Sequence, residues 1–178
     1  EGHRAVVDHP GRFGLFASLP LPDVDAAIAE IAHCCDHLDV AGFALLTNVG
    51  GTYLGDAAFQ PVFHELDRRG ARLFIHPTSP ACWERTSLGR PRPMLEFLFD
   101  TTRAVVDLVL NGTIAAHPGI EVIVPHAGAT GGLAAPGVPP APPGAPWARD
   151  SRIASSAPSL RGSARMAMAS PGAGSWPA

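Results

Sequence analysis

Two short apolar runs, each followed directly by a histidine, constrain the fold of this chain more than any other feature. The first run is Arg72–Ile75 (RLFI), which leads into His76, and the second is Glu121–Pro125 (EVIVP), which leads into His126. Runs of this length, rich in β-branched and aliphatic residues, are typical of buried parallel strands. Side chains at the carboxyl ends of the strands in a (β/α) barrel point into one shared site. The sequence therefore predicts that His76 and His126 meet over one pocket.

Apolar segments alternate with amphipathic segments from the amino terminus to about residue 128. We expect strands over residues 13–19, 41–46, 72–75 and 121–125, and helices over residues 24–38, 56–69 and 95–110. Asp23 is placed to cap the first of these helices. Alternation of this kind predicts βαβ units with a parallel sheet. Four strands amount to half of an eight-stranded barrel, so we expect an α/β fold, either a partial TIM (β/α)8 barrel or an open four-stranded sheet.

Composition changes abruptly after residue 130, where Ala, Gly, Pro and Ser dominate as far as the carboxyl terminus. We therefore divide the chain into a barrel-type domain over residues 1–130 and a low-complexity tail over residues 131–178. Such a segment cannot bury enough apolar surface to offset the entropy of ordering it, so disorder is expected. Two origins stay open, a natural flexible tail or codons of GC-rich DNA read out of frame. The absence of Lys, whose codons are A-rich, favours the second origin.

Length and composition argue against several classes of protein. The 178 residues have a net charge of −3 and no apolar stretch long enough to span a bilayer, so we expect no membrane partner. The arginines form no basic stripe with interleaved aromatic residues, and we expect no nucleic-acid partner. Cys34, Cys35 and Cys82 are odd in number and form no CxxC pattern, which favours a reducing, cytoplasmic location. The chain begins at Glu1 rather than Met, which favours a fragment or a processed start.

Two groups of polar residues have simple structural interpretations. His33 and His37 are four residues apart on a helix, and their helical phase places them on the side that faces solvent. Asp100, Arg103 and Asp107 are three and four residues apart on the long apolar helix, a spacing typical of charge pairs that stabilise a helix. We expect this helix to pack on the outside of the sheet, with these charges stabilising the helix itself.

Asn48 follows the second predicted strand and precedes two glycines in the segment Thr47–Gly51 (TNVGG). A polar group at this end of a strand could bind substrate, which makes Asn48 a candidate substrate-binding residue. Formation of a tight turn explains the same residue at least as well, because Asn hydrogen-bonds readily to nearby backbone. Both interpretations stay open.

Five strings of sequence, taken in order, resemble the amidohydrolase-related metal-dependent decarboxylases. They are GRFGLFASLPLPDVDAA, LLTNVGGTYLGD, ELDRRGARLFIHPT, MLEFLFDTTRAV and IEVIVPHAG, and they extend over about residues 10–128. This group includes aminocarboxymuconate-semialdehyde, γ-resorcylate and 6-methylsalicylate decarboxylases. The resemblance implies a (β/α)8 barrel, dimeric in the family, that removes CO2 without oxidation from a small aromatic or muconate-type carboxylic acid. Metal-dependent hydrolysis by the same kind of barrel is the alternative.

The resemblance also implies a bound Zn²⁺, or another divalent metal such as Mn²⁺, held by four protein ligands. Two ligands form a His-x-His motif on the first strand, one is the histidine of an HP string, and one is an Asp after the last strand. His76 matches the HP histidine as a metal ligand, and His126 matches the catalytic acid/base. No His-x-His motif occurs in this chain, and no carboxylate stands where the last Asp is expected. One imidazole binds zinc weakly, so we expect an incomplete, inactive fragment.

Overall fold

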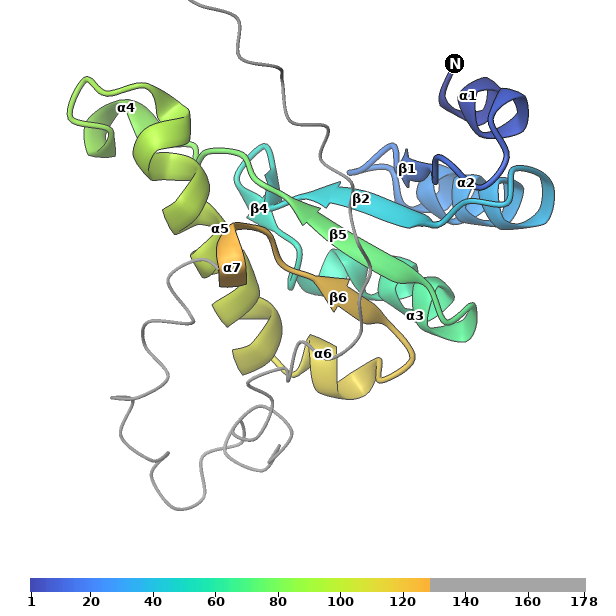
Figure 1. Ribbon diagram of the computed structural model, residues 1–178. Helices are drawn as coiled ribbons and strands as arrows, with labels where there is room; N and C mark the ends of the chain where they lie inside the picture. Colours follow the sequence, from blue (N-terminus) through green and yellow to red (C-terminus); the bar gives the residue numbers. More distant parts are fainter. Residues whose placement is uncertain (129–178) are drawn as a thin grey trace, which may run out of the picture.

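The computed structural model of the chain, which describes residues 1–128, contains one parallel sheet of four strands in the order β1-β2-β5-β6 (Figure 1). These strands lie at the four predicted positions: β1 (Phe16–Ser18), β2 (Gly42–Leu46), β5 (Arg72–His76) and β6 (Glu121–Ile123). Every neighbouring pair is parallel and is joined by a helical crossover, as βαβ units require. The predicted α/β architecture is therefore confirmed.

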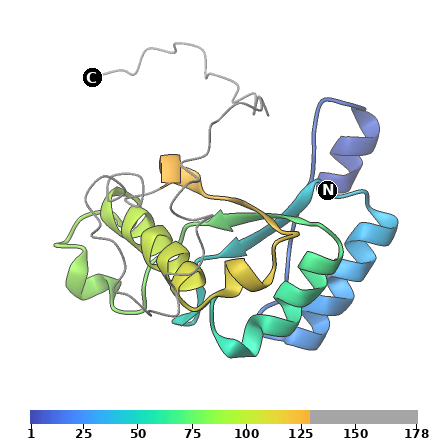
Figure 2. The same cartoon turned by 90° about the horizontal axis from the view of Figure 1, so that it is seen from below.

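Helices connect the strands and cover one face of the sheet. α2 and α3 lie side by side on that face, and Figure 2 shows both of them on the same side of β2 and β5. The main helices are α2 (Val24–His37), α3 (Gln60–Arg68), which follows the 3-10 turn η1 (Ala57–Phe59), and α5 (Arg92–Leu110). The short helices are α1 (Gly2–Asp8), α4 (Trp83–Thr86), α6 (Thr113–Ala116) and α7 (Pro125–Gly128).

The hydrophobic core lies between the sheet and this helical layer. Alternate residues of the two central strands point into it, because side chains alternate between the two faces of a strand. The core side chains that these strands contribute are Phe43, Leu45, Leu73 and Ile75. The helices contribute their own buried faces, with Ile31 from α2, Phe63 and Leu66 from α3, and Leu108 from α5.

The other alternate residues of the strands point to the opposite face of the sheet. Phe16 and Leu46 are 37% and 45% exposed there, and His76 is exposed as well. The ring of Phe74 contacts the rings of Phe16 and His76 edge-on, with centroid distances of 6.4 and 6.3 Å. In a complete (β/α)8 barrel the helices form the outer ring and the other face lines the interior. His76 therefore lies on the face that a closed barrel encloses.

Local sequence signals explain where several elements begin and end. Asp23 caps α2, as predicted, because its carboxylate accepts the backbone N–H of Ala26 at 2.9 Å. The helix begins at Val24, the residue after Asp23. Gly70 has a φ of 59° directly after the turn that ends α3, and Gly112 has a φ of 84° after α5. Glycine adopts this left-handed conformation without steric cost, which suits it to both stops.

The short elements were not predicted. They include α1, α4, α6 and a hairpin of β3 (Asn48–Val49) with β4 (Thr52–Tyr53), and none is long enough to show a hydrophobic period. The hairpin turns at Gly50 and Gly51, whose φ values of 59° and 92° match a two-residue turn with both central residues at positive φ. Among the described residues, no helix combines the length and the hydropathy needed to cross a membrane. The predicted tail over residues 131–178, and its origin, lie outside the described residues.

Candidate functional site

His76 and His126 follow two strands that are neighbours in the sheet. Phe74 of β5 lies opposite Ile123 of β6, so His76 is two residues beyond this pair and His126 is three residues beyond it. α7, which contains His126, contacts β5 and α5 (Figure 1). Both histidines are exposed at the carboxyl edge of the sheet. That the two side chains meet over one pocket, and their chemical roles, stay predictions.

The imidazole of His76 is oriented by the carbonyl of the next residue. Its Nδ1 lies 2.9 Å from the Pro77 carbonyl oxygen, an atom that can only accept a hydrogen bond. The neutral ring therefore has its proton on Nδ1, which leaves the Nε2 lone pair available. Histidines that bind metals usually donate their second ring N–H to a carbonyl or carboxylate in this way. This orientation is compatible with a metal ligand, and the role of His76 stays a prediction.

His126 has an unusual backbone conformation. Its φ is 58°, and among the histidines of residues 1–128 it is the one in the left-handed region. Side chains with a Cβ adopt this region rarely, and residues held there concentrate at functional sites. The backbone strain is thus a second feature, besides position, that singles out His126.

Asn48, the first residue of β3, is buried, with 5% of its surface exposed. Its Nδ2 donates to the Ser79 carbonyl at 3.1 Å and to Oδ2 of Asp100 at 2.8 Å. Its Oδ1 accepts from the backbone N–H of Gly51 at 3.0 Å. These contacts are those of a residue that forms the turn, the second of its two interpretations. Substrate binding by Asn48 stays a prediction without a supporting contact.

Asp100 pairs with Arg103 within α5, as the spacing predicts, but its side chain lies in the interior of the protein. Its side chain is fully buried, and the Arg103 guanidinium lies 3.5 Å from Oδ1 with nearly half of its own surface exposed. The carboxylate also accepts hydrogen bonds from Thr47, Asn48 and Tyr53. Burying a carboxylate is costly unless it is hydrogen-bonded, and these three donors compensate for that burial.

The helical phase of α5 contained the signal that was missed. Asp100 is four residues before Ala104 and eight before Leu108, and all three side chains are buried on one face of the helix. Applying the 3.6-residue period to the charged positions as well as the apolar ones predicts a buried Asp100. The length and apolar content of the helix do not distinguish this face from the exposed one.

Tyr53 connects the β3–β4 hairpin to α5. Its hydroxyl donates to Oδ1 of Asp100 at 2.5 Å. Burial, this hydrogen bond and the negative charge of Asp100 all raise the pKa of the phenol above its usual value. Tyr53 is therefore a stable donor to Asp100 at neutral pH.

His33 and His37 lie on the exposed side of α2, as the sequence predicted. Their rings stack with a centroid distance of 5.0 Å, and Nδ1 of His37 lies 3.1 Å from the His33 carbonyl oxygen. They are on the helical layer rather than at the edge that carries His76. This pair is thus separate from the candidate site.

The described residues do not complete a metal site. Within residues 1–128, no group of three or more His, Cys, Asp or Glu side chains is arranged to hold a metal ion. The remaining residues of the sequence contain no His, Cys or Glu, and their one Asp is Asp150. A closed zinc site uses four protein ligands and a catalytic one usually three. Residues 1–128 therefore offer one candidate ligand of the implied site, at His76, and do not form the site by themselves.

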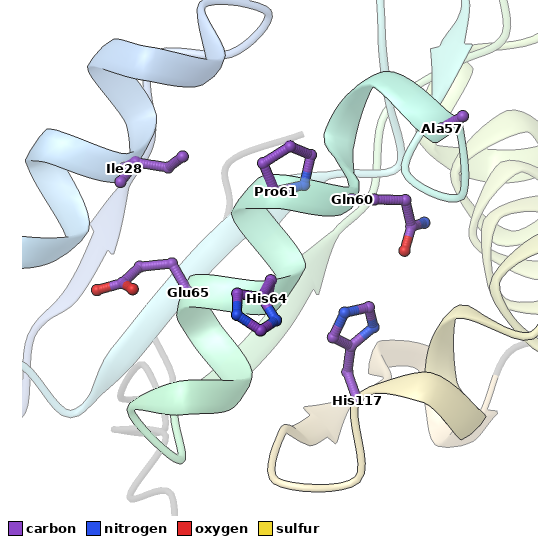
Figure 3. Close-up of a pocket in the computed structure, with 7 residues that line it drawn as sticks. All are labelled: Ile28, Ala57, Gln60, Pro61, His64, Glu65 and His117. Carbon is purple, nitrogen blue, oxygen red and sulfur yellow. The ribbon is translucent and has the colours of Figure 1, made fainter.

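A shallow hollow of about 600 Å³ lies on the helical layer, and neither His76 nor His126 is among the residues that line it (Figure 3). His117 lines it and is buried. Its Nδ1 lies 2.9 Å from the Thr113 carbonyl oxygen, and its ring contacts the ring of Phe63. The sequence around His117 shows no partner pattern and predicts a surface residue, and its burial shows this expectation to be wrong. Glu65 also lines the hollow, but its carboxylate binds Arg68 and Arg69 at 2.6 and 2.7 Å. The hollow thus contains no free carboxylate to pair with its histidines.

Comparison with known proteins identifies relatives of the chain. It is 41% identical over 124 residues to a 6-methylsalicylic acid decarboxylase of Penicillium expansum, a match that covers 68% of this chain and 38% of that protein. It is 30% identical over 130 residues to a 2-amino-3-carboxymuconate-6-semialdehyde decarboxylase of Dictyostelium discoideum, covering 70% and 35% of the two chains. The chain therefore spans less than two fifths of the length of these two relatives.

Solved structures share the fold. A crystal structure of an amidohydrolase II is 32% identical with a TM-score of 0.71, and the match covers 75% of this chain and 44% of that one. A dihydroxybenzoic acid decarboxylase of Polaromonas sp. JS666, crystallised with manganese and an inhibitor, has a TM-score of 0.67 at 20% identity, over 74% and 43% of the chains. The amidohydrolase family model matches residues 4–161. The chain belongs to the amidohydrolase family, and its four parallel strands form part of the family's (β/α)8 barrel.

Proposed function

We propose that the complete barrel to which this chain corresponds removes CO2, without oxidation, from a small aromatic carboxylic acid. One observation carries the proposal: His76 and His126 share the carboxyl edge of neighbouring parallel strands. The relatives named above support it, because both are called decarboxylases. The higher identity to the 6-methylsalicylic acid enzyme favours an aromatic substrate over a muconate-type one.

We assign His76 as one ligand of a divalent metal, through Nε2. The orientation of its ring supports this role, since Nδ1 is already bonded to the Pro77 carbonyl. The other ligands must come from parts of the barrel beyond the described residues, because residues 1–128 contain no cluster of three ligands. Zn²⁺ suits a site of imidazole and carboxylate ligands, and Mn²⁺ is the alternative, as bound in the Polaromonas enzyme. Such an ion would supply positive charge to fix the carboxylate of the substrate.

We assign His126 as the acid/base. When the bond between the ring carbon and the carboxyl group breaks, the electron pair stays on the ring and CO2 leaves. A proton must then reach that carbon, and an imidazole changes its protonation near neutral pH. The position of His126 after the strand next to that of His76 supports this assignment. For Asn48 we favour formation of the loop over contact with substrate, since its amide is already hydrogen-bonded.

Hydrolysis of a C–N or C–O bond is the alternative, because barrels of this family can activate water in the same position. The names of the relatives favour the carboxy-lyase. We further propose that the complete protein forms homodimers, from the family resemblance, and works in the cytoplasm, which the three free cysteines of residues 1–128 support.

A chimaera tests the proposal. Residues 1–128 replace the matching segment of the Penicillium expansum enzyme, and CO2 release from 6-methylsalicylate and γ-resorcylate is measured beside hydrolysis of an ester. We expect CO2 release by the chimaera, loss of bound metal in His76→Ala, and loss of rate with metal retained in His126→Ala. His37→Ala is the control for a surface histidine and should change neither. Ester hydrolysis without CO2 release would establish the alternative. If His126→Ala lost the metal and His76→Ala retained it, the roles assigned to the two histidines would have to be exchanged.

A further inference from the structure

We propose that Asp100 and Thr47 are positioning residues that determine which ring nitrogen of His76 is free. Neither side chain contacts the imidazole. They act through a continuous series of hydrogen bonds that runs from α5, across the loop after β2, to the peptide that follows β5. This inference rests on the role proposed for His76, and its test uses neither metal nor substrate.

The first link joins the buried carboxylate to the loop after β2. Oδ2 of Asp100 accepts the hydroxyl proton of Thr47, and both side chains are fully buried. A threonine hydroxyl has one proton and two lone pairs. Because its proton is given to Asp100, the Thr47 oxygen presents only lone pairs to its other neighbours. The carboxylate thus makes Thr47 an acceptor toward the rest of the loop.

The second link joins Thr47 to the strand end that carries His76. The Thr47 oxygen accepts the backbone N–H of Thr78 at 3.2 Å. The backbone N–H of Thr47 donates to the His76 carbonyl at 3.1 Å. These two hydrogen bonds flank Pro77 on both sides. Thr47 therefore fixes the backbone from the carbonyl of residue 76 to the amide of residue 78.

The third link follows from the planarity of the peptide group. The Thr78 N–H and the Pro77 C=O belong to one rigid peptide unit, so fixing one of them fixes the direction of the other. The Pro77 carbonyl is the group that lies 2.9 Å from Nδ1 of His76. The orientation of this carbonyl places the ring proton on Nδ1 and leaves Nε2 as the free lone pair. Asp100 is thereby coupled to the tautomer of His76.

The ordinary role of a buried network, which is stability alone, makes a different prediction. If the network only stabilises the fold, removing any buried hydroxyl of α5 or of the neighbouring loop should change the tautomer ratio of His76 equally, or should not change it. Thr101 provides the comparison, because it is fully buried beside Asp100 and its hydroxyl donates to the Phe97 carbonyl at 2.7 Å. That hydrogen bond stays within α5 and has no connection to the segment 76–78.

The tautomer can be measured by NMR on the 178-residue chain. Long-range ¹H–¹⁵N correlations of the imidazoles are recorded at pH about 8.5, where an unperturbed histidine, with a pKa of about 6.5, is neutral. The His76 signals are assigned by their loss in His76→Gln. We expect mainly the Nδ1–H form in the unchanged chain. Thr47→Val, which removes the acceptor for Thr78 at constant shape, should shift the ratio toward Nε2–H by about threefold to tenfold.

Three matched variants decide the outcome. Thr47→Ser retains the hydroxyl and should restore the Nδ1–H form, and Asp100→Asn, with one acceptor fewer, should give a smaller shift in the same direction as Thr47→Val. Thr101→Val should leave the ratio unchanged. The proposal is overturned if His76 is mainly Nε2–H in the unchanged chain, or if Thr47→Val leaves the ratio unaltered. An equal shift in Thr101→Val would overturn it as well. If Asp100→Asn folds and leaves the tautomer ratio unaltered, Asp100 has no part in orienting His76. If that variant does not fold, the comparison of Thr47→Val with Thr47→Ser tests the proposal.

Discussion

The hydroxyl of Tyr53 and Oδ1 of Asp100 are 2.5 Å apart, although the two residues are separated by 47 positions in the sequence. This contact joins the β3–β4 hairpin to α5 and completes the set of donors around a buried carboxylate. Thr47 and Asn48 supply the other two donors from the same loop. A single aspartate thus holds the loop between Thr47 and Tyr53 in place, close to the strand end that carries His76.

Replacement of Tyr53 by Phe should destabilise the protein. It removes a donor to a buried carboxylate while leaving the ring, so the oxygen of Asp100 loses a partner that water does not replace. We expect the free energy of unfolding to fall by about 1–3 kcal/mol, measured by urea denaturation. Phe99→Leu, at an exposed position of α5, is the control and should change the stability by less than about 0.5 kcal/mol. Equal stability of Tyr53→Phe and the unchanged chain would contradict the account of Asp100.

Replacement of Gly55 by Ala should be destabilising for a steric reason. A Cβ at this position would lie 1.9 Å from Nδ2 of Asn111 and 2.3 Å from Oδ2 of Asp107, both on or next to the end of α5. Asn111 also donates to the Gly55 carbonyl at 2.8 Å, so the added methyl group displaces an existing hydrogen bond. We expect a loss of about 1–3 kcal/mol in thermal or urea unfolding.

Two further variants test the steric explanation for Gly55. Gly14→Ala adds a Cβ that meets one atom, the Cβ of Ala41 at 3.2 Å, and should cost less. Combining Gly55→Ala with Asn111→Ala removes the nearest obstacle and should recover part of the lost stability. If the double variant were as unstable as the sum of its two single variants, steric overlap with Asn111 would not be the cause.

Acid should weaken the cluster of Glu65 with Arg68 and Arg69. Hydrogen bonds from Arg68, then from Arg69, and the charges of both lower the pKa of Glu65 from 4.5 to about 2, in spite of partial burial. A carboxyl whose pKa is lower in the folded state contributes stability above its unfolded pKa. That contribution is lost as the pH falls from about 4.5 toward 2.

The matching experiment compares Glu65→Gln with the unchanged chain by urea unfolding. At pH about 6 the variant should be less stable by about 1 kcal/mol, because Arg68 is largely exposed, and at pH about 3 the difference should shrink. Asp8→Asn, which removes the exposed pair with Arg4, should show little difference at either pH. A difference for Glu65→Gln that is independent of pH would show that the charge of Glu65 is not what stabilises the cluster.

The isolated 178-residue chain should have no decarboxylase activity and no tight zinc site. Residues 1–128 form no cluster of three metal ligands, and the rest of the sequence adds only Asp150 to the possible ligands. Calorimetric titration with zinc should give weak binding, and His76→Ala should leave its affinity unchanged. His37→Ala, which disrupts the exposed histidine pair on α2, is the comparison variant. Turnover of 6-methylsalicylate by the purified chain that is lost in His76→Ala would contradict this prediction.

The sequence was sufficient to predict the architecture, because its strands and long helices are marked by periodicity and by stop signals. The run before His76 and the face of α2 each follow one period closely, and Asp23, Gly70 and Gly112 stand where the elements begin or end. The hairpin at Gly50 and Gly51 was predicted only as a turn. Its strands have two residues each, too few for an alternating pattern to be visible.

The site was predictable to the extent that it depends on strand ends. Parallel strands bring their carboxyl ends to one edge, and this rule places His76 and His126 after neighbouring strands, as the register of β5 and β6 shows. The surroundings of His76 were not predictable in this way, since they depend on a contact between Thr47 and Asp100 across 53 positions. A charged residue within a helix is usually exposed, and only the phase of α5 shows that Asp100 is an exception.

The sheet face that carries Phe16 and Leu46 has a consequence for how the protein behaves when it is made. Over residues 1–128 this face presents apolar side chains to water, and the sheet ends in two parallel edge strands, β1 and β6. Edges and apolar surface of this kind recruit further chains into insoluble deposits. Overproduced alone, part of the polypeptide should accumulate in inclusion bodies beside a soluble fraction, and Phe16→Ser with Leu46→Ser should raise the soluble yield.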